Sequence, residues 1–274
     1  MNYKGYEDLV LNDEELSELY QNNSLENYNF LENEYGLIRD KSNKIIDYIK
    51  FQDGQVKNVG FPIFESRYTG KVVGRNPQQR LAMDMLLDPS IEIKLLAGGY
   101  GCGKDYLMIN AALEALEKNQ FEKIVWVRNN IEVKDSTALG SLPGDEISKL
   151  LPWIMVLADH VGGIDGVYNL IESGKVEPIH IGFIRGRDIK NSIIYSTEAE
   201  NLTTQHVQLL LGRVGEGSNL WINGDWRQRD KKVFEKNSGL ETTIEKLRGN
   251  RHFGYVHLEK SERSKIAALA DLLD

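Results

Sequence analysis

The segment LLAGGYGCGKDYLM, residues 95–108, constrains the fold of this chain more than any other stretch. Gly98, Gly103 and Lys104 fit the pattern G-x-x-x-x-G-K, with an apolar run before them and a helical pattern after them. A strand that enters such a loop and a helix that leaves it distinguish a phosphate-binding loop from an ordinary glycine-rich turn. The glycines let backbone N–H groups wrap phosphate oxygens, while the helix N-terminus and the lysine add positive potential. The segment therefore predicts a nucleotide site at the end of a buried strand.

The chain after Asn76 alternates apolar strands with helical stretches. Strands are expected at 91–98, 123–128, 191–197, 219–224 and 253–258, and helices at 77–88, 105–119, 146–161 and 203–214. This alternation is typical of βαβ units and of a largely parallel sheet that is flanked by helices. We therefore expect an α/β P-loop NTPase fold of the helicase or RecA-like type over residues 71–274.

Residues 1–70 predict a smaller module with a different pattern. Asn12 followed by Glu15 is a capping signal for a short helix. Asp53 and Gly54 form a turn signal between the apolar runs of residues 35–61. We expect an α+β module made of this helix and an antiparallel sheet of two or three strands, which is too small to fold well alone. Residues 65–77 have the composition of a linker.

The overall charge argues against general nucleic-acid binding. The 274 residues carry 33 Lys and Arg against 41 Asp and Glu, a net charge of −8, whereas affinity for phosphates comes from cationic contacts. The single cysteine, Cys102, excludes an intrachain disulfide and a cysteine zinc cluster. Because the chain shows neither a secretory signal nor an apolar run of 18 residues, we expect a cytoplasmic protein without a membrane segment.

Asp105 stands where a standard phosphate loop has a serine or threonine hydroxyl that helps to hold Mg²⁺. The later strand that should carry a metal-binding carboxylate runs into Thr197, with threonine in the place of the acid. We interpret this as an exchange, in which both residues face one ion from adjacent strand ends. An exchange keeps one hydroxyl and one carboxylate for a hard, oxygen-seeking cation, and independent decay of the two positions is the alternative. Because Asp105 repels phosphate, nucleotide binding should depend strongly on the metal.

Five longer segments surround these positions. They are GRNPQQRLAMDMLLDPSIEI before the loop, VRNNIEVKDSTALGSLPGDEISKLLPW after it, IRGRDIKNSIIYSTEAENLT, GDWRQRD and LEKSERSKIAALADLL. Together they resemble the PhoH-like P-loop ATPases, and most of all the ATPase half of larger members that carry a PIN nuclease domain. Residues 11–60 resemble the connector between the two halves, and without a PIN domain ahead of it we expect no nuclease activity. The departures from the family pattern are Asp105, Thr197, Glu200, Asn129 and Trp226.

The resemblance implies that ATP and Mg²⁺ bind here, and it implies roles for single residues. Glu198 would polarise the attacking water, Gln228 would sense the γ-phosphate, and Arg263 would be an arginine finger for its own site or a neighbour's. Gln79 would contact the adenine. The implied catalytic residues are thus Glu198, Lys104, Gln228 and Arg263; the nucleotide-binding residues are Gly98, Gly99, Tyr100, Gly101, Cys102, Gly103, Lys104, Asp105 and Gln79; and the metal ligands are Asp105 and Thr197.

The resemblance also implies partners, namely RNA or single-stranded DNA and further copies of this chain in a homo-oligomer such as a ring. Arg128, Arg185 and Arg187 are the cationic residues that we expect to cluster for such contacts. Trp126, Trp153 and Trp221 lie in apolar patterns and are expected in the core. Trp226 lies in a turn, where a base or a nucleotide can reach it.

Two functions stay open on the residues alone. The first is an ATPase that couples hydrolysis to RNA, DNA or helicase-like work, because water-orienting and charge-stabilising residues are present. The second is a nucleotide-binding switch or assembly module with slow or no hydrolysis, which the altered residues Asp105 and Thr197 favour. A small-molecule kinase is a weaker third reading, since no arginine-bearing lid is evident in the sequence.

Overall fold

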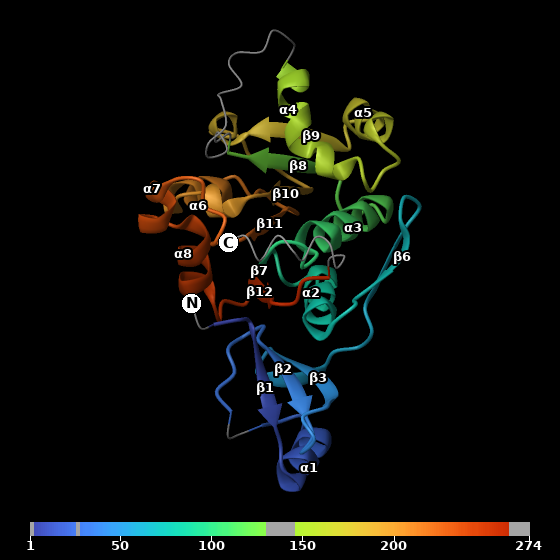
Figure 1. Cartoon of the computed structure of the whole chain (residues 1–274), viewed down its shortest axis with the longest axis vertical. Helices are drawn as coiled ribbons and strands as arrows, with labels where there is room; N and C mark the ends of the chain where they lie inside the picture. The colour runs from blue at the N-terminus through green and yellow to red at the C-terminus, as the bar shows by residue number, and fades with distance from the viewer. Residues whose placement is uncertain (1–2, 26–27, 130–145, 263–274) are drawn as a thin grey trace.

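The main body of the molecule is a parallel sheet of six strands (Figure 1). The computed structural model describes residues 3–25, 28–129 and 146–262, and the strand order in this sheet is β12-β7-β11-β10-β8-β9. The strands are β7 (Ile93–Gly98), β8 (Lys123–Arg128), β9 (Val176–His180), β10 (Ser192–Ser196), β11 (Asn219–Gly224) and β12 (Phe253–Leu258). All neighbouring pairs run parallel, which confirms the expected α/β P-loop NTPase fold.

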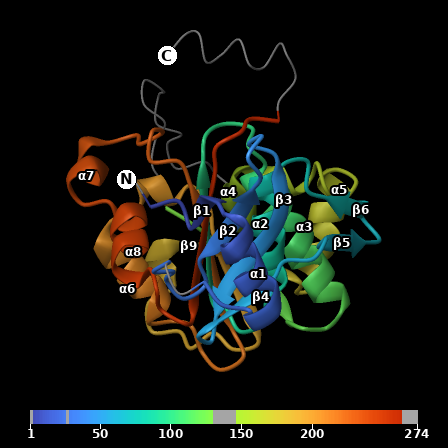
Figure 2. The same cartoon turned by 90° about the horizontal axis from the view of Figure 1, so that it is seen from below.

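Helices cover both faces of this sheet (Figure 2). One face carries α2 (Pro77–Leu87), α3 (Lys104–Glu117), α4 (Glu146–Ile154) and α5 (Ile164–Glu172), and the other carries α6 (Thr204–Leu211), α7 (Lys232–Lys236) and α8 (Gly239–Leu247). Three short 3-10 helices complete this part: η1 (Met155–Leu157), η2 (Ile181–Phe183) and η3 (Ala199–Asn201). Each helical layer closes over its own buried apolar cluster. None of the helices in the described ranges is long and apolar enough to cross a membrane.

Burial on both faces explains which strands the sequence predicted well. Strands covered on both sides read as continuous apolar runs, and β8, β11 and β12 have the predicted bounds. β9 was missed, because this edge strand contains Pro178 and reads as a broken pattern. The helices α5, α7 and α8 were not predicted either.

The order of the strands corrects one expectation about the site. β11 lies between β7, which leads into the glycine loop, and β10, which leads to Thr197. Asp105 and Thr197 therefore do not follow adjacent strands, as the sequence analysis expected. Asn223 and Asp225, at the end of β11, lie between the strand that leads to Asp105 and the strand that leads to Thr197.

The N-terminal part is a second sheet of four strands with one helix. It contains β1 (Tyr6–Val10), α1 (Asp13–Asn22), β2 (Tyr35–Arg39), β3 (Ile45–Gln52) and β4 (Gln55–Asn58). The predicted capping box is present, since the Asn12 side chain accepts from the backbone N–H of Glu15 and the Glu15 side chain accepts from Asn12. The β3–β4 turn contains Asp53 and Gly54, both at positive φ. The antiparallel strands expected over residues 35–61 are present as β2, β3 and β4. The strand β1 was not predicted, and it pairs parallel with β2.

Residues 63–73 form a hairpin where the sequence analysis expected a linker. β5 (Ile63–Ser66) pairs antiparallel with β6 (Gly70–Val73), and Phe64 faces Val72 on the buried side. The backbone N–H of Glu65 donates to the Glu114 side chain of α3 at 3.0 Å. Each strand is only four residues long and has one buried apolar residue, Phe64 or Val72, which is why the composition of this segment did not reveal a hairpin. The division of the chain at residue 70 stays a prediction, and it falls at the start of β6.

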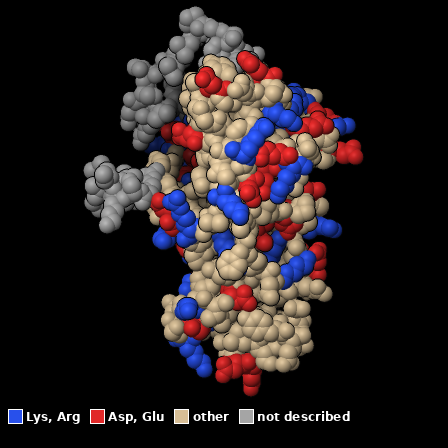
Figure 3. Space-filling view, turned by 90° about the vertical axis from the view of Figure 1, so that its right-hand side faces the viewer, with Lys and Arg blue, Asp and Glu red and all other residues tan. Residues whose placement is uncertain are grey.

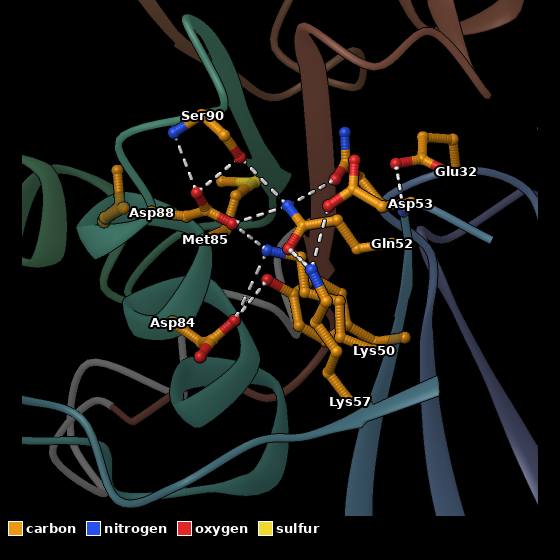
Figure 4. Close-up of polar contacts among 12 residues, drawn as sticks. Glu32, Lys50, Gln52, Asp53, Lys57, Asp84, Met85, Asp88 and Ser90 are labelled. Carbon is orange, nitrogen blue, oxygen red and sulfur yellow. Dashed lines mark hydrogen bonds and ion pairs between the residues drawn. The ribbon is translucent and has the colours of Figure 1, made fainter. Parts of the chain in front are cut away.

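A buried polar network joins the N-terminal sheet to helix α2 (Figure 4). Lys50 on β3 is ion-paired with Asp88 and lies 3.8 Å from an oxygen of Asp84, with its own side chain 5% exposed. The Gln52 side-chain N–H donates to Asp88 at 2.8 Å and to Ser90 at 3.0 Å. Because each buried charge has a partner, the junction is specific rather than a loose apolar contact.

Candidate nucleotide-binding site

The glycine loop connects β7 to α3 in a conformation that needs glycine. Gly103 caps the helix at φ 93°, a left-handed value that costs a residue with a Cβ atom. Gly98 approaches the neighbouring chain closely, because a Cβ atom there would collide with the carbonyl oxygen of Leu258. The Lys104 Nζ lies inside the loop and donates to the carbonyl oxygens of Gly98 at 2.7 Å and Gly99 at 3.0 Å. The lysine is thus placed where phosphate oxygens can replace those carbonyls as its acceptors.

The loop opens on a cavity of about 320 Å³ at the carboxyl ends of the strands. Ligands of such sheets bind at this edge. The cavity brings together side chains that are up to 128 positions apart in the chain, from Tyr100 to Gln228. It is lined by Tyr100, Gly101, Lys104, Asp105, Arg128, Pro152, Trp153, Val156, Thr197, Glu198, Glu200, Asn223, Gly224, Asp225 and Gln228. Most of the predicted site residues are therefore neighbours in space.

Asp105 is held by two side chains that the sequence analysis did not single out. Its Oδ1 accepts from the Tyr195 hydroxyl at 3.0 Å and from the Asn223 side-chain N–H at 2.7 Å. The Asn223 N–H also lies 2.7 Å from the Tyr195 oxygen. Burial and the nearby Asp105 raise the pKa of Tyr195 well above its ordinary value, so its hydroxyl stays a donor. These hydrogen bonds join the first turn of α3 to β10 and β11. The sequence signal that could have revealed them is the polar residue near the end of each of these two apolar strands.

The residues proposed as metal ligands are of the right chemical kind. Asp105 and Thr197 both line the cavity, and Asp105 keeps a second carboxylate oxygen, Oδ2, besides the hydrogen-bonded Oδ1. Within the described ranges, no three or more His, Cys, Asp or Glu side chains are grouped to hold a metal ion. Mg²⁺ is usually bound by one or two protein oxygens together with substrate phosphates and water. Both residues remain proposed ligands.

Glu198 follows β10 and points into the same cavity. Its backbone is left-handed, at φ 52° and ψ 46°, which is uncommon for a residue other than glycine. Its carboxylate forms an ion pair with the guanidinium of Arg128, the last residue of β8. Burial raises the pKa of Glu198, while Arg128 opposes the rise. A partly desolvated carboxylate at this place has the character of a general base.

Glu200, Asp225 and Gln228 form a chain of contacts across the cavity floor. The Asp225 backbone N–H donates to Glu200 at 2.9 Å, and the Gln228 side-chain N–H donates to Asp225 at 2.7 Å. Burial raises the pKa of Glu200 to about 7. The position of Gln228 is thus set by the buried Asp225, with the amide beside the predicted phosphate site.

Gln79 touches the glycine loop directly. Its side-chain N–H donates to the carbonyl oxygen of Cys102 at 2.9 Å, and its side-chain oxygen accepts from the Arg75 N–H at 2.9 Å. The amide N–H therefore joins α2 to the loop, while the amide oxygen is bound by the backbone just before α2. The predicted contact of Gln79 with adenine stays a prediction.

The segment after β12 runs to the glycine loop. The backbone N–H of Glu262 donates to the Gly101 carbonyl at 2.9 Å, and its side chain accepts from Asn76 at 2.9 Å. Three residues earlier, Glu259 accepts from the Tyr6 hydroxyl and pairs with Lys4, both at 2.7 Å. The predicted arginine finger, Arg263, lies outside the described residues, as does most of the segment after Asn129, residues 130–145.

Arg128 and Arg187, two of the three predicted cationic residues, do not lie together. Arg128 ends β8 at the cavity, whereas Arg187 pairs with Glu177 at 2.5 Å near the start of β9. The start and the end of β8 are about 16 Å apart, since a strand rises about 3.3 Å per residue. Figure 3 shows one face of the molecule, on which Lys and Arg lie interspersed with Asp and Glu. The expectation failed because spacing along the chain did not reveal that the sheet separates these residues.

The tryptophans divide differently from the prediction. Trp126 and Trp221 are buried in the core as expected. Trp153 was expected in the core, and this prediction was wrong. The residue is only partly buried and lines the cavity, with its ring 6.0 Å from that of His180. Trp226 is also partly buried and packs edge-on against His257 at 4.7 Å. The apolar pattern around Trp153 marks the cavity wall rather than the core.

Comparisons with known proteins show which family this chain resembles. A family model described as "PhoH-like protein" matches residues 71–272. "Protein PhoH2" of Bacillus subtilis is 32% identical over 289 residues, which covers 99% of this chain and 64% of the relative. "Protein PhoH2" of Thermobispora bispora is 35% identical over 200 residues (72% and 46%), and "Protein PhoH" of Escherichia coli is 30% identical over 218 residues (77% and 59%). The chain spans between 46% and 64% of the length of these curated relatives.

Proposed function

This chain belongs to the PhoH-like protein family, and on that premise we propose that it is an Mg²⁺-dependent ATPase. The carrying observation is that Lys104, Glu198 and Gln228 line one cavity beside the glycine loop. These are a phosphate-binding lysine, a carboxylate that can orient water and an amide placed to contact the γ-phosphate. Together they are the parts that phosphoryl transfer to water requires.

The proposed reaction needs little covalent chemistry from the protein. A water oxygen bonds to the γ-phosphorus, and the bond from that phosphorus to the β–γ bridging oxygen breaks, so that ADP leaves. The proton of the water passes to the Glu198 carboxylate and then to the released phosphate. Lys104 and the loop N–H groups hold the transferred group and offset its charge.

Asp105 and Thr197 would hold the metal ion, through a carboxylate oxygen and a hydroxyl. When bound, Mg²⁺ would neutralise charge on the β- and γ-phosphate oxygens. The hydrogen bonds from Tyr195 and Asn223 keep Asp105 oriented in the cavity. Because Asp105 repels the phosphates, ATP affinity should fall strongly when the metal is removed.

We further propose that hydrolysis is coupled to RNA or single-stranded DNA, and that copies of the chain assemble into a ring. Both proposals rest on the resemblance described above. Arg263 would then complete the site of its own chain or of a neighbour.

Phosphate release from ATP tests the enzymatic part. The native chain should release phosphate with Mg²⁺ and not with excess EDTA, and Glu198→Gln should lower kcat by about 10²-fold or more while ATP still binds. Glu172→Gln, the same change at an exposed residue of α5, is the matched control and should keep native turnover. Equal turnover in the Glu198 and Glu172 variants would refute the role of Glu198.

A nucleotide-binding switch is the second candidate. The observation that favours it is the ion pair of Glu198 with Arg128, which occupies the proposed base, together with the missing acid at Thr197. In that case ATP should bind to the native chain with Mg²⁺, while no phosphate appears with or without a single-stranded oligonucleotide. Turnover that Glu198→Gln abolishes would reject the switch.

A further inference from the structure

Arg128 occupies a place that the proposed chemistry does not use. It is the last residue of β8, and its side chain, 23% exposed, pairs with Oε1 of Glu198, whose side chain is 42% exposed. Both residues line the cavity of the glycine loop. One oxygen of the proposed base is therefore bound to a cation instead of facing water.

The surrounding charges explain the direction in which Glu198 points. Asp105 and Asp230 both act on Glu198 as like charges, whereas Arg128 attracts its carboxylate. β8 borders β10 on the side away from β11 and β7. The ion pair therefore draws Glu198 toward the β8 side of the cavity and away from the strand that leads into the loop.

We propose that Arg128 is a positioning residue that holds Glu198 in a resting orientation, and that a phosphate group of a single-stranded nucleic acid releases Glu198 by taking its place on Arg128. This inference rests on the proposed ATPase function. A carboxylate in an ion pair is a poor acceptor for the proton of water, because its lone pairs already bind a cation. Turnover should accordingly be slow until Arg128 is engaged elsewhere.

The wall beside Arg128 suits such a partner. Pro152, Trp153 and Val156 also line the cavity. The ring of Trp153 lies 6.0 Å from that of His180, and His180 is the residue of β9 that pairs with Arg128. Arginine binds phosphate through two parallel N–H bonds, which makes a phosphodiester a strong competitor for a carboxylate. An aromatic ring next to it offers a face on which a base can stack, a combination typical of single-strand binding.

Steady-state hydrolysis by three variants tests the proposal. Arg128→Met removes the cation, so basal kcat should rise about threefold or more, a small part of the ~10²–10⁴-fold that a positioned base contributes. The KM for ATP should change less than twofold. Arg128→Lys keeps the charge and should return kcat toward the native value. Arg39→Met, which breaks the ion pair with Asp8 in the N-terminal sheet, is the matched control and should not change kcat.

The nucleic-acid step is tested with an oligouridylate strand. Added to the native chain at low salt, it should raise kcat toward the value of Arg128→Met, and it should not stimulate that variant further. A lower kcat in Arg128→Met with native ATP affinity, or equal stimulation of both proteins, would overturn the proposal. If neither the native chain nor Arg39→Met releases phosphate although both bind ATP, the ATPase function itself fails, which is a different result.

Discussion

Replacing Glu200 with glutamine should stabilise the folded chain at neutral and alkaline pH. The Glu200 side chain is buried, with the residue 5% exposed, and its carboxylate accepts from the Asp225 backbone N–H. Burial raises its pKa to about 7, against 4.5 for an exposed glutamate. The folded state therefore binds more protons than the unfolded state between these two values, and its stability falls as pH rises through them. Glutamine keeps the oxygen acceptor for Asp225 and removes only the charge.

The magnitude follows from the two pKa values. One pKa unit corresponds to about 1.4 kcal/mol, so a charged Glu200 costs the folded state about 3 kcal/mol at pH 8 and under about 1 kcal/mol at pH 5. Glu200→Gln should remove this cost, so the gap in free energy of unfolding between variant and native chain should grow over that range. Below pH 4.5 the carboxyl is protonated in both states, and the gap should disappear.

Urea unfolding of both proteins without nucleotide, at pH 5, 6, 7 and 8, measures this gap. The exposed Glu172→Gln control should stay within about 0.5 kcal/mol of the native chain at each pH. A gap that does not depend on pH, or a native chain more stable than Glu200→Gln at pH 8, would refute the reasoning. Either result would mean that Glu200 is not a buried, desolvated carboxyl.

Three further outcomes are expected. Asp105→Thr should weaken Mg²⁺-dependent ATP binding in calorimetry, and Asp105→Thr with Thr197→Asp should recover it; if the single change improves binding as much as the double one, the exchange idea fails. Tyr195→Phe removes one of the two donors to Asp105 and should weaken ATP binding several-fold with Mg²⁺ but not without it, and an equal effect in both conditions would argue for a general packing defect. Lys50→Met leaves Asp88 buried without its cation and should lower the free energy of unfolding by about 3 kcal/mol, so a loss below about 1 kcal/mol in urea titration would contradict the described junction.

The sequence predicted the local elements of this structure better than its long-range contacts. Gly98 to Lys104 could be predicted as a phosphate loop because the motif, its strand and its helix are contiguous, and β8 or β11 because burial on both faces leaves an unbroken apolar run. The order of the strands could not be predicted, since the pairing between β7 and β11 depends on contacts across more than 100 residues. Because the strand order was unknown, Asp105 and Thr197 were wrongly expected at the ends of adjacent strands.

The missed site residues share the same cause. Tyr195 and Asn223 contact Asp105 only because β10 and β11 are neighbours. Trp153 follows an apolar pattern that fits a cavity wall as well as a core. The pairing of Arg128 with Glu198 joins the ends of two strands that lie 70 positions apart in the chain. Each of these needs the tertiary arrangement, whereas the chemical types at the site could be read directly.

The path from Lys4 to the glycine loop has a mechanical consequence. Lys4 and Tyr6 hold Glu259, and three residues further Glu262 is bonded to Gly101. Because the Lys4 carbonyl oxygen also accepts from the His257 backbone N–H of β12 at 2.9 Å, a displacement of this segment would be transmitted to the carbonyl of Gly101 together with the end of β12. A displacement of that segment would therefore change how tightly the loop binds its predicted phosphate ligand. Release of the ligand would in turn let the segment move.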